Sequence, residues 1–345
     1  MMHGLAASPA ASLPPQPTPP RPAVPQPGKR EARRQWLHDL PSRSALRAFN
    51  HPWLRPWLGR RHARALDQYR TRLPSLSEAD ARIVAAIERD GVYITTLDAL
   101  QIADSATIMR AGAALADAFA PQARDRAAAG EPFLYVPPAW LFDCPTLFEW
   151  GLDQRLLDIA ESYIGLPAAY DGVCLNYTVA DGREVSTRKW HRDWEDRRML
   201  KVAVYLDDVD GEGGPFQIIR RRDSGQDDRN GFDYELADTA ELERRLGPDF
   251  ADDVCSCEGP AGTVIFTDTA RFFHRGKPAT ARDRAALFYS YFARRPRHPF
   301  LCERSGMPRA DIARLARNLP DRQRQAALWR RGLPLPLRMI PSARL

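Results

Sequence analysis

Two hydrophobic patterns divide the chain and predict two kinds of element. In the first half, apolar residues recur every three or four positions, as at Ile83, Val84 and Ile87, which is the spacing of an amphipathic helix. In the middle of the chain, short β-branched and aromatic runs are separated by Gly, Pro and Asp, which is typical of strands joined by turns. The predicted strands cover residues 173–179, 201–206, 216–219, 263–266 and 285–293. After Pro299 the helical spacing returns.

Residues that begin and end helices mark the predicted boundaries. Ser77 is a residue type that caps helix N-termini and Gly91 is one that ends helices, so a helix is expected over 78–89. The residues after Gly91, Val92, Tyr93 and Ile94, are expected to form a strand. Asp98 and Gln101 resemble a capping box at the start of another. The further predicted helices cover residues 98–119, 152–164, 238–246, 308–317 and 321–330. Before residue 73 short helices are expected, because proline interrupts helices. The expected breaks are at Pro41, Pro52 and Pro56.

These patterns predict four segments. Residues 1–28 are rich in Pro and Ala and cannot bury enough apolar surface to offset their chain entropy, so we expect a disordered tail. Residues 29–75 are expected to form a helical extension, and residues 299–345 a C-terminal helical segment. Residues 76–298 form the expected main domain, in which several short strands indicate an all-β sandwich or barrel.

Composition narrows the class of protein. With 44% hydrophobic and 27% charged residues, the 345-residue chain has the make-up of a soluble globular protein. No run approaches the roughly 20 apolar residues of a membrane-spanning helix, and the N-terminus lacks a secretory pattern. We therefore expect a cytoplasmic protein without a membrane partner. Five scattered cysteines, including a lone C-x-C at Cys255 and Cys257, predict neither a disulfide framework nor a zinc site.

The charge balance bears on partners. The net charge of +6 favours an anionic group on a small-molecule substrate. Acidic residues are interleaved with the arginines nearly everywhere, so no uniform basic stripe is evident. This argues against a nucleic-acid partner.

Candidate chemistry begins in the run RKWHRDWED. His191 and Asp193 are two residues apart, so in a strand their side chains point to the same side. One imidazole and one carboxylate are two of the three groups of a 2-His-1-carboxylate face, which leaves positions open on iron for a co-substrate and O₂. The motif is short and arises by chance. The alternative interpretation is a strand-end histidine paired with Asp193.

A second histidine and an arginine extend the pattern. His274 lies 81 residues beyond Asp193 (274 minus 193), between two predicted strands, which leaves ample chain to return beside the first motif. Arg284 opens the strand AALFYSYFA. Its planar guanidinium suits the far carboxylate of a dicarboxylate co-substrate that chelates iron at its other end. Arg282 is the competing anchor, and either arginine is also compatible with a surface position.

The order H-x-D, then H-R-G-x-P, then Arg at the start of an apolar strand resembles the phytanoyl-CoA dioxygenase-like family of iron(II)/2-oxoglutarate oxygenases. The runs MLKVAVYLDDVDGEGGPF and IERDGVYITTLDAL are similar to the family's as well, so the resemblance covers about residues 76–295. It implies a mainly β protein with a double-stranded β-helix (jelly roll) core and flanking helices. It also implies Fe(II) on His191, Asp193 and His274, and 2-oxoglutarate held by Arg284.

The activity that this resemblance implies is oxidation of a small molecule with O₂. Hydroxylation of an unactivated carbon would release succinate and CO₂, and the carboxylate at Asp193 favours hydroxylation over halogenation. Two alternatives remain open: a cupin-like metal enzyme that does not use 2-oxoglutarate, and a non-catalytic jelly-roll binding module. Four residues near the metal motif are candidates for a substrate pocket and equally for core or surface: Tyr177, Lys189, Trp190 and Trp194.

Overall fold

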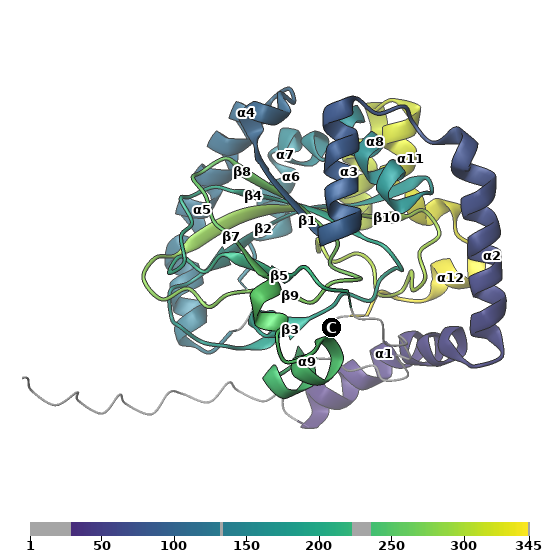
Figure 1. Ribbon diagram of the computed structural model, residues 1–345, viewed down its shortest axis with the longest axis horizontal. Helices are drawn as coiled ribbons and strands as arrows, with labels where there is room; N and C mark the ends of the chain where they lie inside the picture. The colour runs from purple at the N-terminus through teal and green to yellow at the C-terminus, as the bar shows by residue number, and fades with distance from the viewer. Residues whose placement is uncertain (1–28, 132–133, 223–235, 344–345) are drawn as a thin grey trace, which may run out of the picture.

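Two antiparallel five-stranded sheets form the centre of the molecule (Figure 1). The computed structural model describes residues 29–131, 134–222 and 236–343. Sheet A comprises, in spatial order, β1 (Val92–Thr96), β8 (Thr263–Thr267), β4 (Leu200–Tyr205), β10 (Arg284–Ala293) and β2 (Ala168–Thr178). Sheet B comprises β6 (Leu236–Ala237), β3 (Trp190–His191), β9 (His274–Gly276), β5 (Phe216–Ile219) and β7 (Val254–Cys257).

The six predicted strands are all present. Five of them form sheet A, whose two faces are both covered, and such strands carry long apolar runs. The other strands of sheet B are short and were not separately predicted, because two to four residues are too few to show a pattern. Cys255 and Cys257 lie on β7, and the five cysteines are free thiols.

Alternation along the strands of sheet A separates two layers of core. On β4, Leu200, Val202 and Val204 pack outward against helices, whereas Ala203 and Tyr205 pack inward between the sheets. The Tyr205 hydroxyl donates to the Cys257 carbonyl at 2.8 Å and accepts from the Phe216 N–H at 2.9 Å, so it joins sheet A to two strands of sheet B. Every second residue on these strands therefore faces the space between the sheets.

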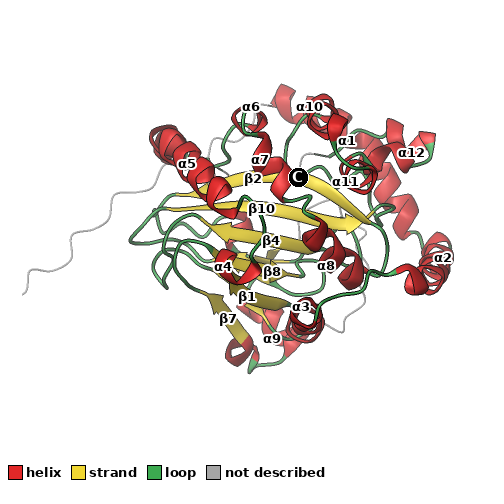
Figure 2. Ribbon diagram, turned by 90° about the horizontal axis from the view of Figure 1, so that it is seen from above, coloured by secondary structure: helices red, strands yellow, loops and turns green. Residues whose placement is uncertain are grey.

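Helices cover the outer face of sheet A (Figure 2). They are α3 (Glu78–Asp90), α4 (Leu97–Leu100), α5 (Ser105–Ala128), α6 (Pro138–Phe142), α7 (Pro145–Trp150), α8 (Gln154–Ile164), α10 (Arg309–Leu315) and α11 (Asp321–Ala327). Short 3₁₀ turns occur at Arg70–Arg72, Ser186–Arg188, Phe250–Asp253, Ala316–Asn318 and Trp329–Gly332. On sheet B, α9 (Thr239–Leu246) packs against Trp190 and Ile219. The C-terminal helices α10 and α11 share one core with the sheet.

The N-terminal helices α1 (Lys29–Asn50) and α2 (Leu54–Tyr69) form an angled arm on the rim, and α12 (Leu335–Met339) lies near them (Figure 1). The predicted breaks at Pro41 and Pro56 are wrong. Pro41 lies inside α1, and packing of the buried face of that helix outweighs the roughly 3 kcal/mol that an interior proline costs. Pro56 lies in the first turn of α2, where its missing N–H has no intrahelical partner to lose. The chain breaks only around Pro52.

Other helix predictions are confirmed, with one exception. The α3 helix begins where Ser77 Oγ accepts the Asp80 N–H, and it ends at Gly91 with φ +76°. The helix expected over 98–119 is instead two helices, α4 and α5. The predicted capping box is wrong, because Thr96 caps α4 by accepting the Ala99 N–H at 3.1 Å, and Gln101 ends it.

Helical residues outnumber strand residues in the described ranges, so the mainly β expectation holds for the central sheets alone. The tail expected at residues 1–28 lies outside the described part of the chain. None of the described helices combines the length and the apolar character needed to cross a bilayer.

Candidate metal centre

Three buried donors from two strand segments meet between the sheets. His191 on β3 pairs directly with His274 on β9, so the antiparallel register brings the two imidazoles together. Asp193 follows β3, and its N–H donates to the Thr269 carbonyl at 2.8 Å. One donor atom from each of His191, Asp193 and His274 lies within 4.8 Å of the others, and the residues are only 3–4% exposed. The structure therefore brings the predicted triad together.

Hydrogen bonds orient both imidazoles toward the shared point. His191 Nδ1 lies 2.8 Å from the Lys189 carbonyl, and His274 Nδ1 lies 3.3 Å from the Phe272 carbonyl. Because a carbonyl only accepts, each Nδ1 carries the proton and each Nε2 presents a lone pair, which is the arrangement of metal-binding histidines. His274 Nε2 is 3.9 Å from Asp193 Oδ2.

The charges around the triad favour its ligating form. Burial alone would raise the pKa of Asp193, but the ion pair with Lys201, together with the nearby histidines, holds that pKa well below its usual value. Burial and the neighbouring His191 hold the pKa of His274 well below its usual value. At neutral pH the site thus offers a carboxylate and a neutral imidazole, the forms that bind metal ions.

Arg284 lies in the same cavity, deeply buried at the start of β10. One of its terminal nitrogens donates to the Gly214 carbonyl and the other to Thr178 Oγ1 at 3.1 Å. Its Nε is buried with no hydrogen-bond partner, and its hydrogen bonds within the described residues go to a carbonyl and a hydroxyl, with no carboxylate among them. Burial lowers its pKa. Arg282, the competing anchor, is exposed and pairs with Asp210 outside the cavity.

A glycine sets the distance between this guanidinium and the metal donors. Gly276 lies two residues beyond His274 on β9, and a Cβ built there would be 3.5 Å from Arg284 Nη2. Two residues of strand span about 7 Å. This separation is comparable to the length of a short dicarboxylate, and a side chain at position 276 would enter the space between the triad and Arg284.

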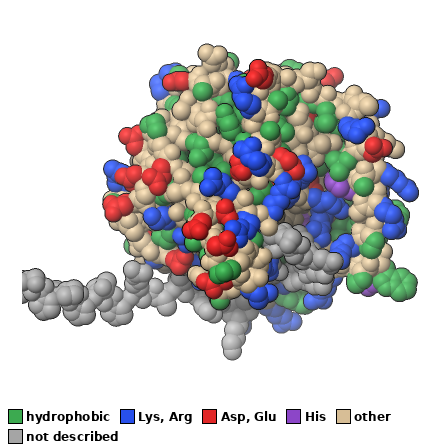
Figure 3. Space-filling view, in the orientation of Figure 1, with side chains coloured by type: hydrophobic (Ala, Val, Ile, Leu, Met, Phe, Trp, Pro, Cys, Tyr) green, Lys and Arg blue, Asp and Glu red, His purple; other side chains and the backbone are tan. Residues whose placement is uncertain are grey.

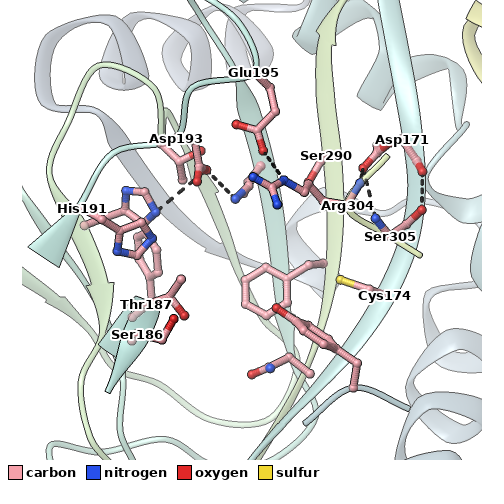
Figure 4. A pocket seen from close by; sticks show the side chains of 18 of the residues that line it. Asp171, Cys174, Ser186, Thr187, His191, Asp193, Glu195, Ser290, Arg304 and Ser305 are labelled. Carbon is pink, nitrogen blue, oxygen red and sulfur yellow. Dashed lines mark hydrogen bonds and ion pairs between the residues drawn. The ribbon is translucent and has the colours of Figure 1, made fainter. Parts of the chain in front are cut away.

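The cavity measures about 360 Å³ and extends past the triad to a second polar end (Figure 4). Inward-facing residues of sheet A form one wall: Cys174, Asn176, Lys201, Phe288 and Ser290. At the far end, Arg304 Nε donates to Glu195 Oε1 at 3.0 Å. The N–H groups of Arg304 and Ser305 donate to Asp171 Oδ2 at 2.6 and 3.1 Å. Burial raises the pKa of Asp171 to about 7.

Sequence reasoning missed the residues that surround the triad. Lys201 carried a usable signal, since a lysine at an inward position of an apolar strand requires a buried partner. Arg304 carried none, because it comes from a loop after the predicted main domain. Asp171 faces the cavity because the register between β2 and β10 shifts between Tyr289 and Tyr291. Such a shift becomes visible only when the pairing of the two strands is known.

The four candidate pocket residues are absent from the lining of this cavity, and the structure places them in the core or at the surface, which was the other interpretation left open for them. Tyr177 faces outward on β2, where its hydroxyl donates to Asp283 at 3.0 Å. Trp190 precedes His191 on β3, so alternation turns it toward α9, where it lies under the Arg275 guanidinium at 4.6 Å. Trp194 is buried beside Phe300, and Lys189 is exposed. Proximity in sequence to the metal motif did not place side chains in the cavity.

Comparisons with known proteins find no matching family model and no matching curated protein. Among solved structures, EctD from S. alaskensis with 2-oxoglutarate and 5-hydroxyectoine is 24% identical, covering 64% of this chain and 79% of that chain at a TM-score of 0.42. The epimerase SnoN with Fe3+, alpha ketoglutarate and nogalamycin RO is 18% identical, and the match covers 70% of this chain and 91% of that chain at a TM-score of 0.41. HygX from Streptomyces hygroscopicus with nickel and 2-oxoglutarate is 14% identical, and the match covers 64% of this chain and 88% of that chain at a TM-score of 0.38. At TM-scores below 0.5 these likenesses carry no conclusion about chemistry.

Proposed function

We propose that this chain is an iron(II)/2-oxoglutarate-dependent dioxygenase that hydroxylates an unactivated carbon of a small molecule, with release of succinate and CO₂. The observation that carries the proposal is one cavity that holds both a buried 2-His-1-carboxylate set and a buried arginine without a carboxylate partner among the described residues. Neither feature alone would distinguish an oxygenase from another metal protein.

The donor set fits iron(II). The two imidazoles of His191 and His274 and the carboxylate of Asp193 would hold a ferrous ion, since this donor set is the one found in non-haem iron(II) oxygenases. When bound, iron and 2-oxoglutarate supply the activation of O₂, which protein side chains cannot provide. Lys201 keeps Asp193 ionised and fixes the carboxylate by a direct ion pair. Phe216 stacks on the His274 ring, with centroids 5.6 Å apart, and restrains its rotation.

Arg284 fits the far carboxylate of 2-oxoglutarate. Its buried Nε has no partner, and a guanidinium in an apolar cavity favours a charge-assisted pair with a carboxylate. Thr178, which already contacts this guanidinium, provides a hydroxyl beside the same point. Phe216 and Phe288 line the adjoining space and exclude water from it. The remaining volume, toward Ser290 and Arg304, is left for the substrate.

The proposal extends to the finer class of the fold. Two five-stranded antiparallel sheets with the triad between them, at the β3–β9 pair, are what a double-stranded β-helix would have. The motif order H-x-D, H-R-G-x-P and Arg supports the proposal that the chain is a member of the phytanoyl-CoA dioxygenase-like group within that class.

Anaerobic titration tests the proposal. Iron(II) should bind with one equivalent per chain, and added 2-oxoglutarate should then produce the visible metal-to-keto-acid charge-transfer band. Iron binding without a band at saturating 2-oxoglutarate would favour the cupin-like enzyme that does not use this co-substrate. Absence of iron binding would favour the non-catalytic binding module.

A further inference from the structure

Large apolar side chains are exposed on the N-terminal arm. Trp36 is 49% exposed, Leu37 52% and Leu40 41% on α1, and Trp53 and Trp57 are 88% and 49% exposed where α2 begins. These five, with Leu335 and Met339 of α12, make up seven of the ten large hydrophobic residues that are exposed in the described ranges. Such clustering differs from the single exposed apolar residues that are normal on soluble surfaces.

The same arm carries the positive charge of the protein. Residues 29–75 contain twelve Lys or Arg and three Asp or Glu, which gives a net charge of +9, whereas the whole chain carries +6. The rest of the chain is therefore net acidic. One of the three acidic residues, Asp39 of α1, is buried and accepts a hydrogen bond from Gln35 of the same helix. The exposed surface of the arm is therefore more basic than the net charge of +9 suggests.

On both helices the basic and apolar residues share the outward side. In α1 the inward side is anchored by Asp39, Ser42 and Leu46, and Ser42 Oγ donates to the Pro341 carbonyl at 2.8 Å. The exposed residues on the rest of α1 include Trp36, Leu37 and Leu40 together with Arg33, Arg34 and Arg47. In α2 no residue is fully buried, and Trp53, Trp57, Arg60, Arg61 and Arg64 all reach the surface. Figure 3 shows basic and hydrophobic side chains together at the rim and at the corner formed by this arm.

We infer that the arm surface, defined by Trp36, Leu40, Trp53 and Trp57 with the arginines between them, docks peripherally on an anionic phospholipid membrane. Tryptophan favours the level of the headgroups, and arginine binds lipid phosphate. The Arg61 guanidinium lies over the Trp57 ring at 5.7 Å, so a charge and an apolar ring are already presented together. The occupant of this surface is a lipid interface, which revises the expectation that no membrane is involved.

Two other occupants fit these observations less well. A second copy of the chain would bring one +9 arm against another, and the two would repel each other. A nucleic acid would neutralise the arginines, but it would leave Leu37, Leu40 and Met339 facing water. A membrane accommodates both kinds of side chain, because apolar groups enter the acyl boundary while arginines stay at the headgroups.

Vesicle co-sedimentation of the full chain tests the inference. Phosphatidylcholine vesicles containing about one quarter phosphatidylglycerol should pellet the protein at least roughly tenfold more strongly than pure phosphatidylcholine vesicles, and added salt should weaken this binding. Brominated lipid should quench the tryptophan fluorescence of the bound protein. W53A/W57A should lose most of the binding and most of the quenching, with Trp36 left as the remaining arm tryptophan, while R60Q/R61Q/R64Q should lose the preference for the anionic lipid.

The matched control is R82Q/R110Q/R244Q, which removes three exposed arginines outside the arm and should bind like the wild type. The exposed positions of all three variants make misfolding a small concern, and an unchanged iron and 2-oxoglutarate titration verifies the fold. Wild-type protein that ignores anionic vesicles, or arm variants that bind as the control does, would overturn the inference. Duplex DNA that competes equally with the vesicles, or self-association that W53A/W57A abolishes, would assign the surface to those partners instead.

Discussion

At the residue scale, the triad depends on side chains that have no substitutes nearby. Asp193→Ala removes the only carboxylate grouped with the two imidazoles among the described residues. We expect this variant to lose stoichiometric iron(II), because two neutral nitrogens and an adjacent Lys201 ammonium cannot retain a divalent ion. Iron content after desalting measures the effect. Glu195→Gln, which alters a carboxylate bound to Arg304 instead, should keep its iron, and equal iron in both variants would contradict the assigned site.

Two arginines that are two positions apart give a second residue-scale prediction. Arg284→Gln should keep iron but weaken 2-oxoglutarate binding by at least roughly 30-fold, because losing one partner of a buried charge pair costs about 2–5 kcal/mol. The titration of the charge-transfer band measures this. Arg282→Gln should bind the co-substrate as the wild type does, since that side chain is exposed and pairs with Asp210. The reverse result would move the anchor out of the cavity.

At the element scale, an irregularity in β2 determines which residues reach the far end of the cavity. The register between β2 and β10 shifts near Tyr289 and Tyr291, and both Asp171 and Gly172 then face inward. Gly172 has φ +103°, and a Cβ there would lie 3.0 Å from Ser305 Oγ. Gly172→Ala should therefore destabilise the protein through both backbone strain and crowding, and urea unfolding measures the loss.

Gly262→Ala separates these two effects. Gly262 has φ +87° but no atom within 4 Å of a Cβ, so its substitution carries the backbone strain alone, roughly 1–2 kcal/mol. We expect Gly172→Ala to cost at least about 1 kcal/mol more, since overpacking typically costs about 1–3 kcal/mol. Equal losses in the two variants would mean that the loop at Ser305 moves aside freely.

At the scale of the whole molecule, the fold buries a carboxyl that links β2 to the C-terminal segment. Burial raises the pKa of Asp171 from 3.8 to about 7. The folded state therefore binds a proton that the unfolded state releases above about pH 4. This contribution to stability is fully present below pH 4 and is lost as pH rises through about 7. One pKa unit corresponds to about 1.4 kcal/mol, so the loss amounts to at most about 4 kcal/mol.

Urea unfolding of wild type and Asp171→Asn between pH 5 and 8 tests this linkage. The asparagine is neutral at each pH and can still accept the N–H groups of Arg304 and Ser305. We expect the wild type to lose more stability than the variant as pH rises, so the variant should be relatively more stable at pH 8 than at pH 5. Asp98→Asn, at an exposed position on α4, should follow the wild type. Parallel curves for wild type and Asp171→Asn would refute the linkage.

The sequence by itself determined the long strands, most helices and the residues of the metal triad. Hydrophobic patterns with a period of 2 in strands and 3.6 in helices arise from burial of one face, so they can be recognised without knowing what an element packs against. The H-x-D spacing places two donors on one side of a strand for the same local reason. The continuity of α1 through Pro41 was missed, because the contacts that hold this helix against the rest of the molecule are not contained in its local sequence.

Only the tertiary structure decided which side chains share the cavity. Arg284 lines the cavity, whereas Arg282 is exposed and pairs with Asp210, and the sequence could not distinguish these two positions. Trp190 is excluded because it is the neighbour of His191 on β3, so its side chain points to the opposite face of the strand. Lys201, Glu195 and Arg304 converge from separate parts of the chain, and their pairing follows from strand register and loop position. Convergence of distant residues is set by packing between elements, and no spacing within one element encodes it.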